Sequence, residues 1–398
     1  MSEIKNLSSR IVKNSRGDDT IEVTVLTTSH SGSFSVPSGA STGSKEVIDL
    51  PVEVALKHIE DIEDKIVGMS VTAQTDIDQR LHELDGHTDN FSSLGGNVAL
   101  GISAAAAVAA AAEQEIPLWQ YFRKAGAAIG NTSAPRLVVN LVNGGKHAKR
   151  GSPIQEHQII PDTTNVAEAL EMAIKVQTSL RQLAEKRFDI EEIGIGDEGG
   201  LELPTTSIQE PFQLIQSAIA ISDVSKPITM GTDVAASSFY SEEGYCLSDS
   251  ILDTESLVGV YKDLSEICPL LRWFEDPFAE SDWEGFVDFG NANIADLTIG
   301  DDLTVTDVAL LEKAIQQQAV NALIIKPNQI GTISDTLNTI DYAHRHNIRC
   351  IVSHRSGETE DTLITDLAYG LQCYGLKAGA PNAPFRQEKY NRLVQIAS

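Results

Sequence analysis

The feature that most constrains the fold is a series of short apolar segments that alternate with long amphipathic stretches from residue 137 onward. This alternation indicates buried strands followed by surface helices, the pattern of βα units. Eight such segments within about 265 residues fit a (β/α)8 TIM-type barrel in size and count. A doubly wound open sheet is the structural alternative. The predicted strands are residues 137–142, 157–160, 193–195, 228–230, 270–274, 297–299, 322–325 and 348–352.

The first two of these strands are joined by a connection that has no helical pattern. Parallel neighbours need a long crossover, usually a helix, so we expect the two opening strands to be antiparallel. The predicted fold class is therefore α/β. Residues 131–398 would form a modified barrel that opens with two antiparallel strands.

Residues 1–130 follow a different pattern and predict a small α+β domain. Residues 21–26 alternate like a half-buried strand, and a turn leads to a second strand that ends at Val36. Apolar residues at helical spacing come next. The alanine-rich stretch 94–112 has too short an apolar part for a membrane span and predicts a buried helix. Small residues, Asn and Pro at 127–135 mark the domain boundary.

The chain is strongly acidic, with 57 Asp and Glu against 30 Lys and Arg and a formal net charge of −27. Nucleic acid and anionic membranes need clustered cations, so we expect neither as a partner. The four cysteines form no C-x-x-C pair and are too few for a disulfide framework. The N-terminal residues contain no apolar run typical of a secretory signal. These features favour a cytoplasmic protein with reduced, buried thiols.

Charged residues follow the predicted strands at the points where the strands end. Catalytic groups of barrels gather at these carboxyl ends, so Asp233, Glu275 and Asp301 should converge. One such acid alone is more often a solvated turn residue. Three together need a cation to stay ionised, because like charges raise each other's pKa. Oxygen ligands favour Mg²⁺, with Mn²⁺ as the alternative, over Zn²⁺.

Other strand-end residues predict acid–base chemistry. Lys326 directly follows an apolar run, and a nearby metal would lower its pKa toward that of a general base. Glu198 is crowded by other acids, which suits a general acid. A base and an acid that flank a metal indicate β-elimination through an enolate. Arg355 and Ser356 form a candidate phosphate clasp, and Lys377 follows soon after.

These motifs resemble those of the enolase family over nearly the whole chain. A chance match to all of them in this order is not credible. The matching segments are Ser15-Arg16-Gly17, Pro37-Ser38-Gly39-Ala40-Ser41-Thr42-Gly43, Asn143-Gly144-Gly145, His147-Ala148, Gln155-Glu156, Gly196-Asp197-Glu198-Gly199-Gly200, Asp233-Val234-Ala235-Ala236-Ser237, Glu275-Asp276-Pro277-Phe278, Gly300-Asp301-Asp302-Leu303-Thr304-Val305-Thr306, Lys326-Pro327-Asn328-Gln329-Ile330-Gly331, Ser353-His354-Arg355-Ser356-Gly357-Glu358-Thr359-Glu360-Asp361 and Lys377-Ala378-Gly379-Ala380-Pro381.

The resemblance implies the reversible, Mg²⁺-dependent dehydration of 2-phosphoglycerate to phosphoenolpyruvate, a step of glycolysis. It implies that Lys326 removes the C2 proton, in keeping with the family's Lys base and Mg²⁺ ions. Glu198 would protonate the departing C3 hydroxyl, with Glu156 nearby. Residues 1–130 would be the family's capping domain, and a homodimer or higher homo-oligomer is expected.

The resemblance also implies two Mg²⁺ ions in each active site and a role for the remaining motif residues. The ligands of the first ion would be Asp233, Glu275 and Asp301, and Ser41 would meet the second ion at the substrate phosphate. The other implied site residues are Lys377 for the enediolate, Arg355 and Ser356 for the phosphate, and His147, Gln155 and His354 for the pocket lining or its closing loops.

Two departures from the family pattern stand out. Lys146, Lys149 and Arg150 occupy a loop expected to close over the site, where the family has small or neutral residues. They are either solvated surface charges or aids to capture of the anionic substrate. The C-terminal acid that meets an Arg of the first motif in family dimers is absent, so Arg16 lacks that partner.

Two other functions stay open at this stage. One is a different superfamily dehydratase that acts on an acid sugar, which the phosphate clasp and the pairing of Lys326 with Glu198 disfavour. The other is a degenerate paralogue with a non-catalytic binding role. The second is disfavoured because every candidate acid, base and metal ligand is retained.

Overall fold

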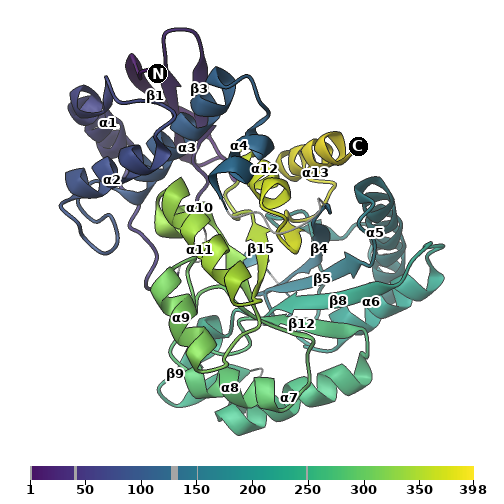
Figure 1. Cartoon of the computed structure of the whole chain (residues 1–398). Coiled ribbons are helices and arrows are strands. Elements are labelled where there is room, and N and C mark those ends of the chain that lie inside the picture. The colour runs from purple at the N-terminus through teal and green to yellow at the C-terminus, as the bar shows by residue number, and fades with distance from the viewer. Residues whose placement is uncertain (1, 40–42, 127–132, 150, 248–249) are drawn as a thin grey trace.

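The computed structural model describes residues 2–39, 43–126, 133–149, 151–247 and 250–398. An N-terminal sheet covered by helices sits beside a barrel that is surrounded by helices (Figure 1). The N-terminal elements are strands β1 (Asn6–Lys13), β2 (Asp19–Leu26) and β3 (Ser31–Ser35) and helices α1 (Val52–Ile66), α2 (Gln74–Asp85), α3 (Gly96–Glu113) and α4 (Leu118–Ala125).

Helix α3 forms the core of the N-terminal part, as the alanine-rich stretch predicts. Fifteen of its 18 residues are buried, and their small side chains let the helix lie close to the sheet. A Cβ atom on Gly32 of β3 would lie 2.2 Å from the Ala109 nitrogen, so only glycine fits at this position. Helix α3 alone among the described helices is long and apolar enough to cross a membrane, but it is 83% buried inside the fold.

Eight strands form the barrel. Strand β4 is antiparallel to β5, and β5 is antiparallel to β8, as expected for the opening of the barrel. Gly375 of β16 pairs with Arg136 of β4, which closes the sheet and excludes the open-sheet alternative. The barrel strands are β4 (Arg136–Asn143), β5 (Glu156–Pro161), β8 (Ile228–Asp233), β12 (Leu271–Glu275), β13 (Leu297–Gly300), β14 (Ala322–Ile325), β15 (Arg349–Ser353) and β16 (Gly375–Lys377).

The barrel strands are buried on both faces. Ile324 of β14 joins a separate interior cluster that includes Val138, Trp273 and Ile299, while its neighbours Leu323 and Ile325 join the outer core. Burial on both faces explains why these strands appear in the sequence as continuous apolar runs.

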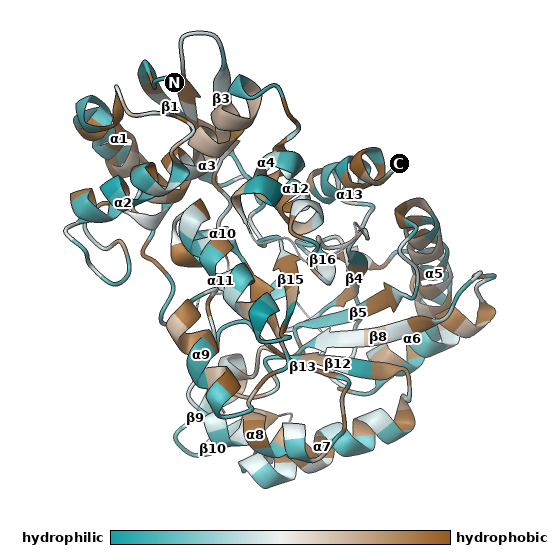
Figure 2. Cartoon of the chain, in the orientation of Figure 1, coloured by the Kyte–Doolittle hydropathy of each residue, from teal (hydrophilic) through white to brown (hydrophobic). Residues whose placement is uncertain are grey.

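Amphipathic helices surround the barrel and carry both hydrophilic and hydrophobic residues (Figure 2). They are α5 (Val166–Phe188), α6 (Glu210–Ile221), α7 (Thr254–Ile267), α8 (Trp283–Asn291), α9 (Val308–Gln316), α10 (Pro327–Ile330), α11 (Ile333–Arg345), α12 (Leu363–Gly370) and α13 (Pro384–Ala397). Short 3-10 turns and strands complete the fold: η1 (Gly145–His147), η2 (Ala236–Phe239), β9 (Tyr240–Ser241), β10 (Gly244–Leu247) and β11 (Ser250–Leu252).

The prediction of a barrel strand at 193–195 is wrong, although residues 194–195 do form a strand. Gly194–Ile195 is β6, an exposed strand of two residues that forms a hairpin with β7 (Leu201–Glu202) beside the end of β4. The eighth barrel strand is β16, which the sequence did not indicate because Gly375-Leu376-Lys377 contains no apolar run. Strand β1 was also unpredicted, since just one of its eight residues is buried.

Loops of the N-terminal part reach the carboxyl ends of the barrel strands. Ser38 and Gly357 form a short antiparallel bridge with reciprocal backbone hydrogen bonds of 2.9 and 2.8 Å. Val47 donates its backbone N–H to the Gln329 carbonyl at 3.0 Å. The two parts of the chain therefore meet at the end of the barrel that carries the charged residues.

Candidate active site

Three buried carboxylates lie at the ends of neighbouring strands. Asp233 is the last residue of β8, Glu275 is the last residue of β12, and Asp301 directly follows β13. The three strands are adjacent in the sheet, with Asp233 and Glu275 paired in register. Asp233 is 4% exposed, Glu275 1% and Asp301 6%. The sheet itself thus brings the three acids together.

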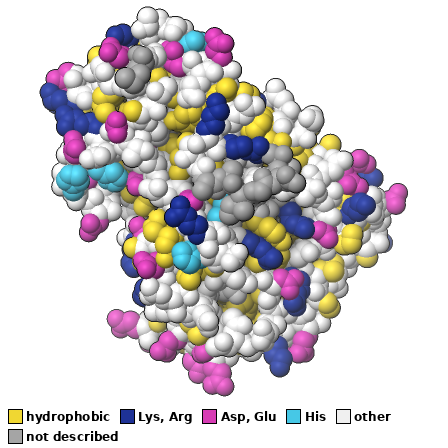
Figure 3. Space-filling view, in the orientation of Figure 1, with side chains coloured by type: hydrophobic (Ala, Val, Ile, Leu, Met, Phe, Trp, Pro, Cys, Tyr) yellow, Lys and Arg dark blue, Asp and Glu magenta, His cyan; other side chains and the backbone are white. Residues whose placement is uncertain are grey.

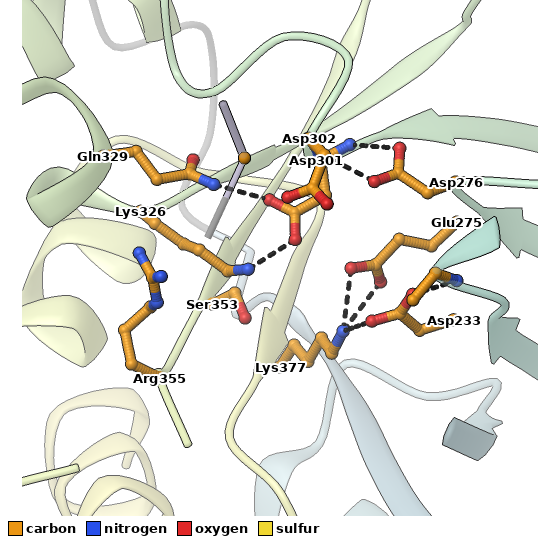
Figure 4. Close-up of polar contacts among 12 residues, drawn as sticks. Asp233, Glu275, Asp276, Asp301, Asp302, Lys326, Gln329, Ser353, Arg355 and Lys377 are labelled. Atoms are coloured by element: carbon orange, nitrogen blue, oxygen red, sulfur yellow. Dashed lines mark hydrogen bonds and ion pairs between the residues drawn. The ribbon is translucent and has the colours of Figure 1, made fainter. Parts of the chain in front are cut away.

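Two lysine ammonium groups lie among these acids (Figure 4). Lys377, the last residue of β16, donates to Glu275 at 2.8 and 2.9 Å and to Asp233 at 3.2 Å. Lys326, directly after β14, donates to Asp301. Asp301 also accepts from the Gln329 amide at 2.8 Å.

Burial and crowding shift the pKa values of the carboxyl groups. Burial, reinforced by neighbouring acids, raises the pKa of Glu275 well above its usual range and also raises that of Asp233. Burial would raise the pKa of Asp301 too, but the nearby cations Lys326, Lys377 and Arg355 together outweigh burial and lower it. A group of acids in this environment requires positive charge close by.

The all-oxygen donor set of these carboxylates suits Mg²⁺, and it already attracts two ammonium groups. Among the described residues, ligand atoms lie within 4.8 Å of one another in two groups, His147 with Glu156 and Glu198, and Asp276 with Asp301 and Asp302. Binding of the ion by Asp233, Glu275 and Asp301 together therefore stays a prediction. Asp276 and Asp302 lie near Asp301 in a second acidic group. The carboxylate of Asp276 accepts the backbone N–H groups of Asp301 and Asp302 at 2.9 and 2.7 Å, so it orients this loop.

The lowered pKa expected for Lys326 depends on a neighbouring metal ion, so it stays a prediction. Among the described residues alone, burial acts to lower this pKa, but the carboxylates of Asp301 and Glu275 together outweigh burial and raise it. Burial also acts to lower the pKa of Lys377, yet Glu156, Glu275 and Asp233 raise it well above its usual range.

Glu198 lies in the loop between β6 and β7 and lines the same pocket. Its carboxylate accepts from the Asn140 amide at 3.0 Å, and His354 Nε2 lies 3.5 Å from its other oxygen. His147 Nδ1 lies 3.9 Å from the same oxygen and 3.0 Å from the Asp197 carboxylate. A hairpin, and not a barrel strand, therefore positions this residue.

The two histidines beside Glu198 differ in charge. Burial would lower the pKa of His147, but Glu198 and Asp197 outweigh it and raise the pKa to about 9. Burial, together with the cations Arg386 and Lys377, lowers the pKa of His354 well below its usual range. At neutral pH the site therefore contains a cationic His147 and a neutral His354.

Arg355 and Ser356 follow β15 at the contact with the N-terminal part. Arg355 Nη1 donates to the Glu46 carboxylate and to the Asn328 amide oxygen, both at 2.9 Å. Arg16 Nη1 donates to Ser356 Oγ at 3.3 Å. Both clasp residues are buried, 4% exposed each, so the N-terminal loops help to hold them in place.

Most of the predicted site residues line one pocket. Glu275 lies next to this pocket, against Lys377. Ser41 lies outside the described residues. The predicted residues that line the pocket are His147, Gln155, Glu156, Glu198, Asp233, Asp301, Lys326, His354, Arg355, Ser356 and Lys377.

Sequence reasoning missed several residues that organise the site. Glu46, Asn140 and Gln329 each bind a site side chain but come from a loop, a strand interior and a short helix. No local sequence signal marks Glu46 or Asn140, whereas Gln329 belongs to the motif that begins at Lys326. Asp276 had a signal, because it directly follows Glu275, and its positive φ of 40° marks a strained turn.

Comparison with known proteins assigns the family. Residues 4–122 match the enolase N-terminal domain, and residues 131–398 match the enolase C-terminal TIM barrel domain. Among its relatives, the chain is 36% identical to the enolase of Methanothrix thermoacetophila and 37% identical to that of Methanocaldococcus jannaschii, each alignment spanning 99% of this chain and 95% of the relative. It is 38% identical to the enolase of Bdellovibrio bacteriovorus, over 100% of this chain and 96% of the relative. The chain belongs to the enolase family.

Proposed function

We propose that this protein catalyses the reversible dehydration of 2-phosphoglycerate to phosphoenolpyruvate. The observation that carries the proposal is a single pocket lined by a base candidate, Lys326, an acid candidate, Glu198, and the clasp residues Arg355 and Ser356. Family membership over both domains supports the same reaction. The acid-sugar and non-catalytic alternatives have no comparable observation in their favour.

Lys326 is proposed to remove the C2 proton. Its side chain is 13% exposed at the pocket, and its ammonium is paired with Asp301. A lysine must be neutral to accept a proton, so the base form requires the Asp301 charge to be engaged elsewhere. Asp301 is also a proposed metal ligand, which couples the state of the base to occupation of the metal site.

Glu198 is proposed to protonate the departing C3 hydroxyl. Its carboxyl group is 3% exposed and is held by Asn140, with His147 and His354 beside it. Glu156, 2% exposed, pairs with Lys377 at 3.1 Å, and burial raises its pKa. The raised pKa shifts Glu156 toward its protonated form beside Glu198, which suits a pair of carboxyl groups that supplies a proton to a leaving group.

Asp233, Glu275 and Asp301 are the proposed ligands of a first Mg²⁺, with Mn²⁺ as a substitute. A second Mg²⁺ is proposed near Ser41. When bound, the cations stabilise the negative charge that develops on the substrate carboxylate as the proton leaves. Lys377 adds a fixed positive charge on the same side, and Arg355 and Ser356 are proposed to bind the phosphate through charge-assisted hydrogen bonds.

We further propose a homodimer or higher homo-oligomer in a reducing cytoplasm. All four cysteines are free thiols, and three of them are buried, which suits a reducing compartment. The acidic side chains on the face seen in Figure 3 are dispersed and not gathered in one patch. We propose neither a nucleic-acid nor a membrane partner.

The test is phosphoenolpyruvate formation from 2-phosphoglycerate, followed by absorbance. We expect product with Mg²⁺, none after EDTA treatment, and recovery when Mg²⁺ is restored. The Lys326→Ala variant should form no measurable product under the same conditions. A folded wild-type chain that forms no Mg²⁺-dependent product would refute the proposed function.

A further inference from the structure

Arg386 is a buried cation near the phosphate end of the site that the proposed mechanism does not use. It belongs to α13 and is 0% exposed. Among the described residues, no Asp or Glu carboxylate oxygen lies within 4.0 Å of a guanidinium nitrogen of Arg386. Burying a charge without an opposite charge is costly, so an arginine in this position requires an explanation.

The guanidinium group of Arg386 binds the backbone of the clasp. Nη1 donates to the Arg355 carbonyl at 2.7 Å, and Nη2 donates to the Ser356 carbonyl at 2.8 Å. Nη2 also reaches the Asp197 carbonyl at 3.5 Å. The planar fork of an arginine matches two successive carbonyls, which a single ammonium cannot do. Arg386 therefore holds the backbone that carries the side chains of Arg355 and Ser356.

Arg386 is also close to the pocket itself. A Cβ atom on Gly379 would lie 3.2 Å from Arg386 Cδ and 3.1 Å from Cε1 of His354, which lines the pocket. After burial, the charge of Arg386 is the next cause of the lowered pKa of His354. The positive charge of Arg386 therefore acts on His354, which lines the pocket.

We propose that Arg386 is a positioning residue for the substrate phosphate. It holds the Arg355 and Ser356 backbone, and the bound phosphate supplies the negative charge that Arg386 lacks in the fold. Two carbonyl dipoles compensate the cation in part, and a phosphate dianion held by the neighbouring side chains completes the compensation. The identity of the substrate rests on the proposed function, but phosphate binding can be measured without turnover.

The experiment is calorimetric titration of inorganic phosphate into the protein in Mg²⁺ buffer, paired with steady-state kinetics. Arg386→Gln should weaken phosphate binding by about tenfold, the scale of losing hydrogen bonds from a charged donor. KM should rise by more than kcat falls. Arg386→Lys keeps the charge but loses the fork, so it should weaken binding by about threefold.

Arg392→Gln is the matched control. Arg392 lies on the same helix, but it pairs with the Asp366 carboxylate at 2.5 and 2.8 Å and makes no contact with the clasp. This variant should bind phosphate as the wild-type chain does. Comparing the two variants distinguishes a general disturbance of α13 from the specific loss of the Arg386 contacts.

Each outcome decides the proposal. A folded Arg386→Gln variant with wild-type phosphate affinity would overturn it, as would a wild-type chain that binds no phosphate. If Arg386→Gln does not fold, Arg386→Lys decides: about threefold weaker binding supports the proposal, and unchanged binding overturns it. A wild-type chain that binds phosphate but forms no phosphoenolpyruvate would refute the proposed function and leave the Arg386 result valid.

Discussion

The two lysines at the mouth of the barrel are held very differently. Lys377 at the end of β16 is 3% exposed in its side chain and lies within 3.2 Å of Glu156, Asp233 and Glu275. Lys326 after β14 is 13% exposed, and Asp301 is its sole carboxylate partner within the described residues. A cation shared by three carboxylates is fixed, whereas one with a single partner can be released when that partner binds elsewhere.

This difference explains how one site can contain both a base and a permanent positive charge. Both lysines have raised pKa values, but that of Lys377 is shifted much further because three carboxylates act on it. A proton carrier must change its charge during the reaction, so Lys326 suits that role. Lys377 suits the stabilisation of charge. The predictions below test this division.

The largest effect is expected from Lys326→Ala. Loss of the base should lower kcat by at least about 10³-fold, within the range of general acid–base catalysis. The fold should be retained, because a single ion pair near the surface of the pocket is lost. The measurement is kcat by absorbance together with the melting temperature. If the variant keeps a tenth of the wild-type kcat or more, Lys326 is not the base.

Lys377→Met should act on stability as well as on activity. It leaves three buried carboxylates without their shared cation, and breaking a buried charge network of this kind costs about 3–5 kcal/mol. Added Mg²⁺ should restore part of the loss by replacing the missing charge. Urea unfolding with and without Mg²⁺ measures this effect, with Lys326→Met as the matched control. Equal loss of unfolding free energy in the two variants would contradict the proposed difference between Lys377 and Lys326.

The buried His147, a cation at neutral pH, predicts a dependence of stability on pH. Its pKa is raised from about 6.5 in the unfolded chain to about 9 in the fold. Its contribution is therefore complete below pH 6.5 and is lost as the pH rises through 9, a change of about 3 kcal/mol. Unfolding free energies between pH 6.5 and 9.5 measure the slope. His147→Gln should flatten it, and an unchanged slope would assign the effect to other groups.

The exposed cations on the same loop should have the smallest effect. Lys146 and Lys149 are exposed beside His147, and Arg150 lies outside the described residues. Replacing both lysines by Gln should lower kcat/KM by about threefold at low salt and have no effect at about 0.5 M salt, because screening removes long-range steering. Lys262→Gln, an exposed lysine on α7, is the control. A salt-independent result would make the loop lysines ordinary solvated charges.

The barrel could be predicted because its parallel strands are buried on both faces. Residues 322–325 and 348–352 appear as apolar runs, and the charged residue after each run marks the open end of the barrel. The hydrophobic pattern did not predict strands that lack an apolar run. Strand β16 has three residues, one of them Lys377, and its place depends on pairing with β4, far away in the sequence.

The site was predictable to the extent that its residues follow strands. Glu198 was expected at a strand end, but a hairpin beside the barrel positions it. Glu46 and Arg386 could not be found from the sequence, because the clasp residues that they contact are 30 or more residues away and their function depends on contacts across the fold. Long-range contacts of this kind leave no local pattern.

The most direct test of the division between base and acid is exchange of the C2 hydrogen of 2-phosphoglycerate with deuterated solvent, measured by NMR. Glu198→Gln should still exchange this hydrogen while forming almost no phosphoenolpyruvate, because Lys326 is intact. Lys326→Ala should lose both exchange and product. If Lys326→Ala still exchanged the C2 hydrogen at the wild-type rate, the assignment of Lys326 as the base would be contradicted.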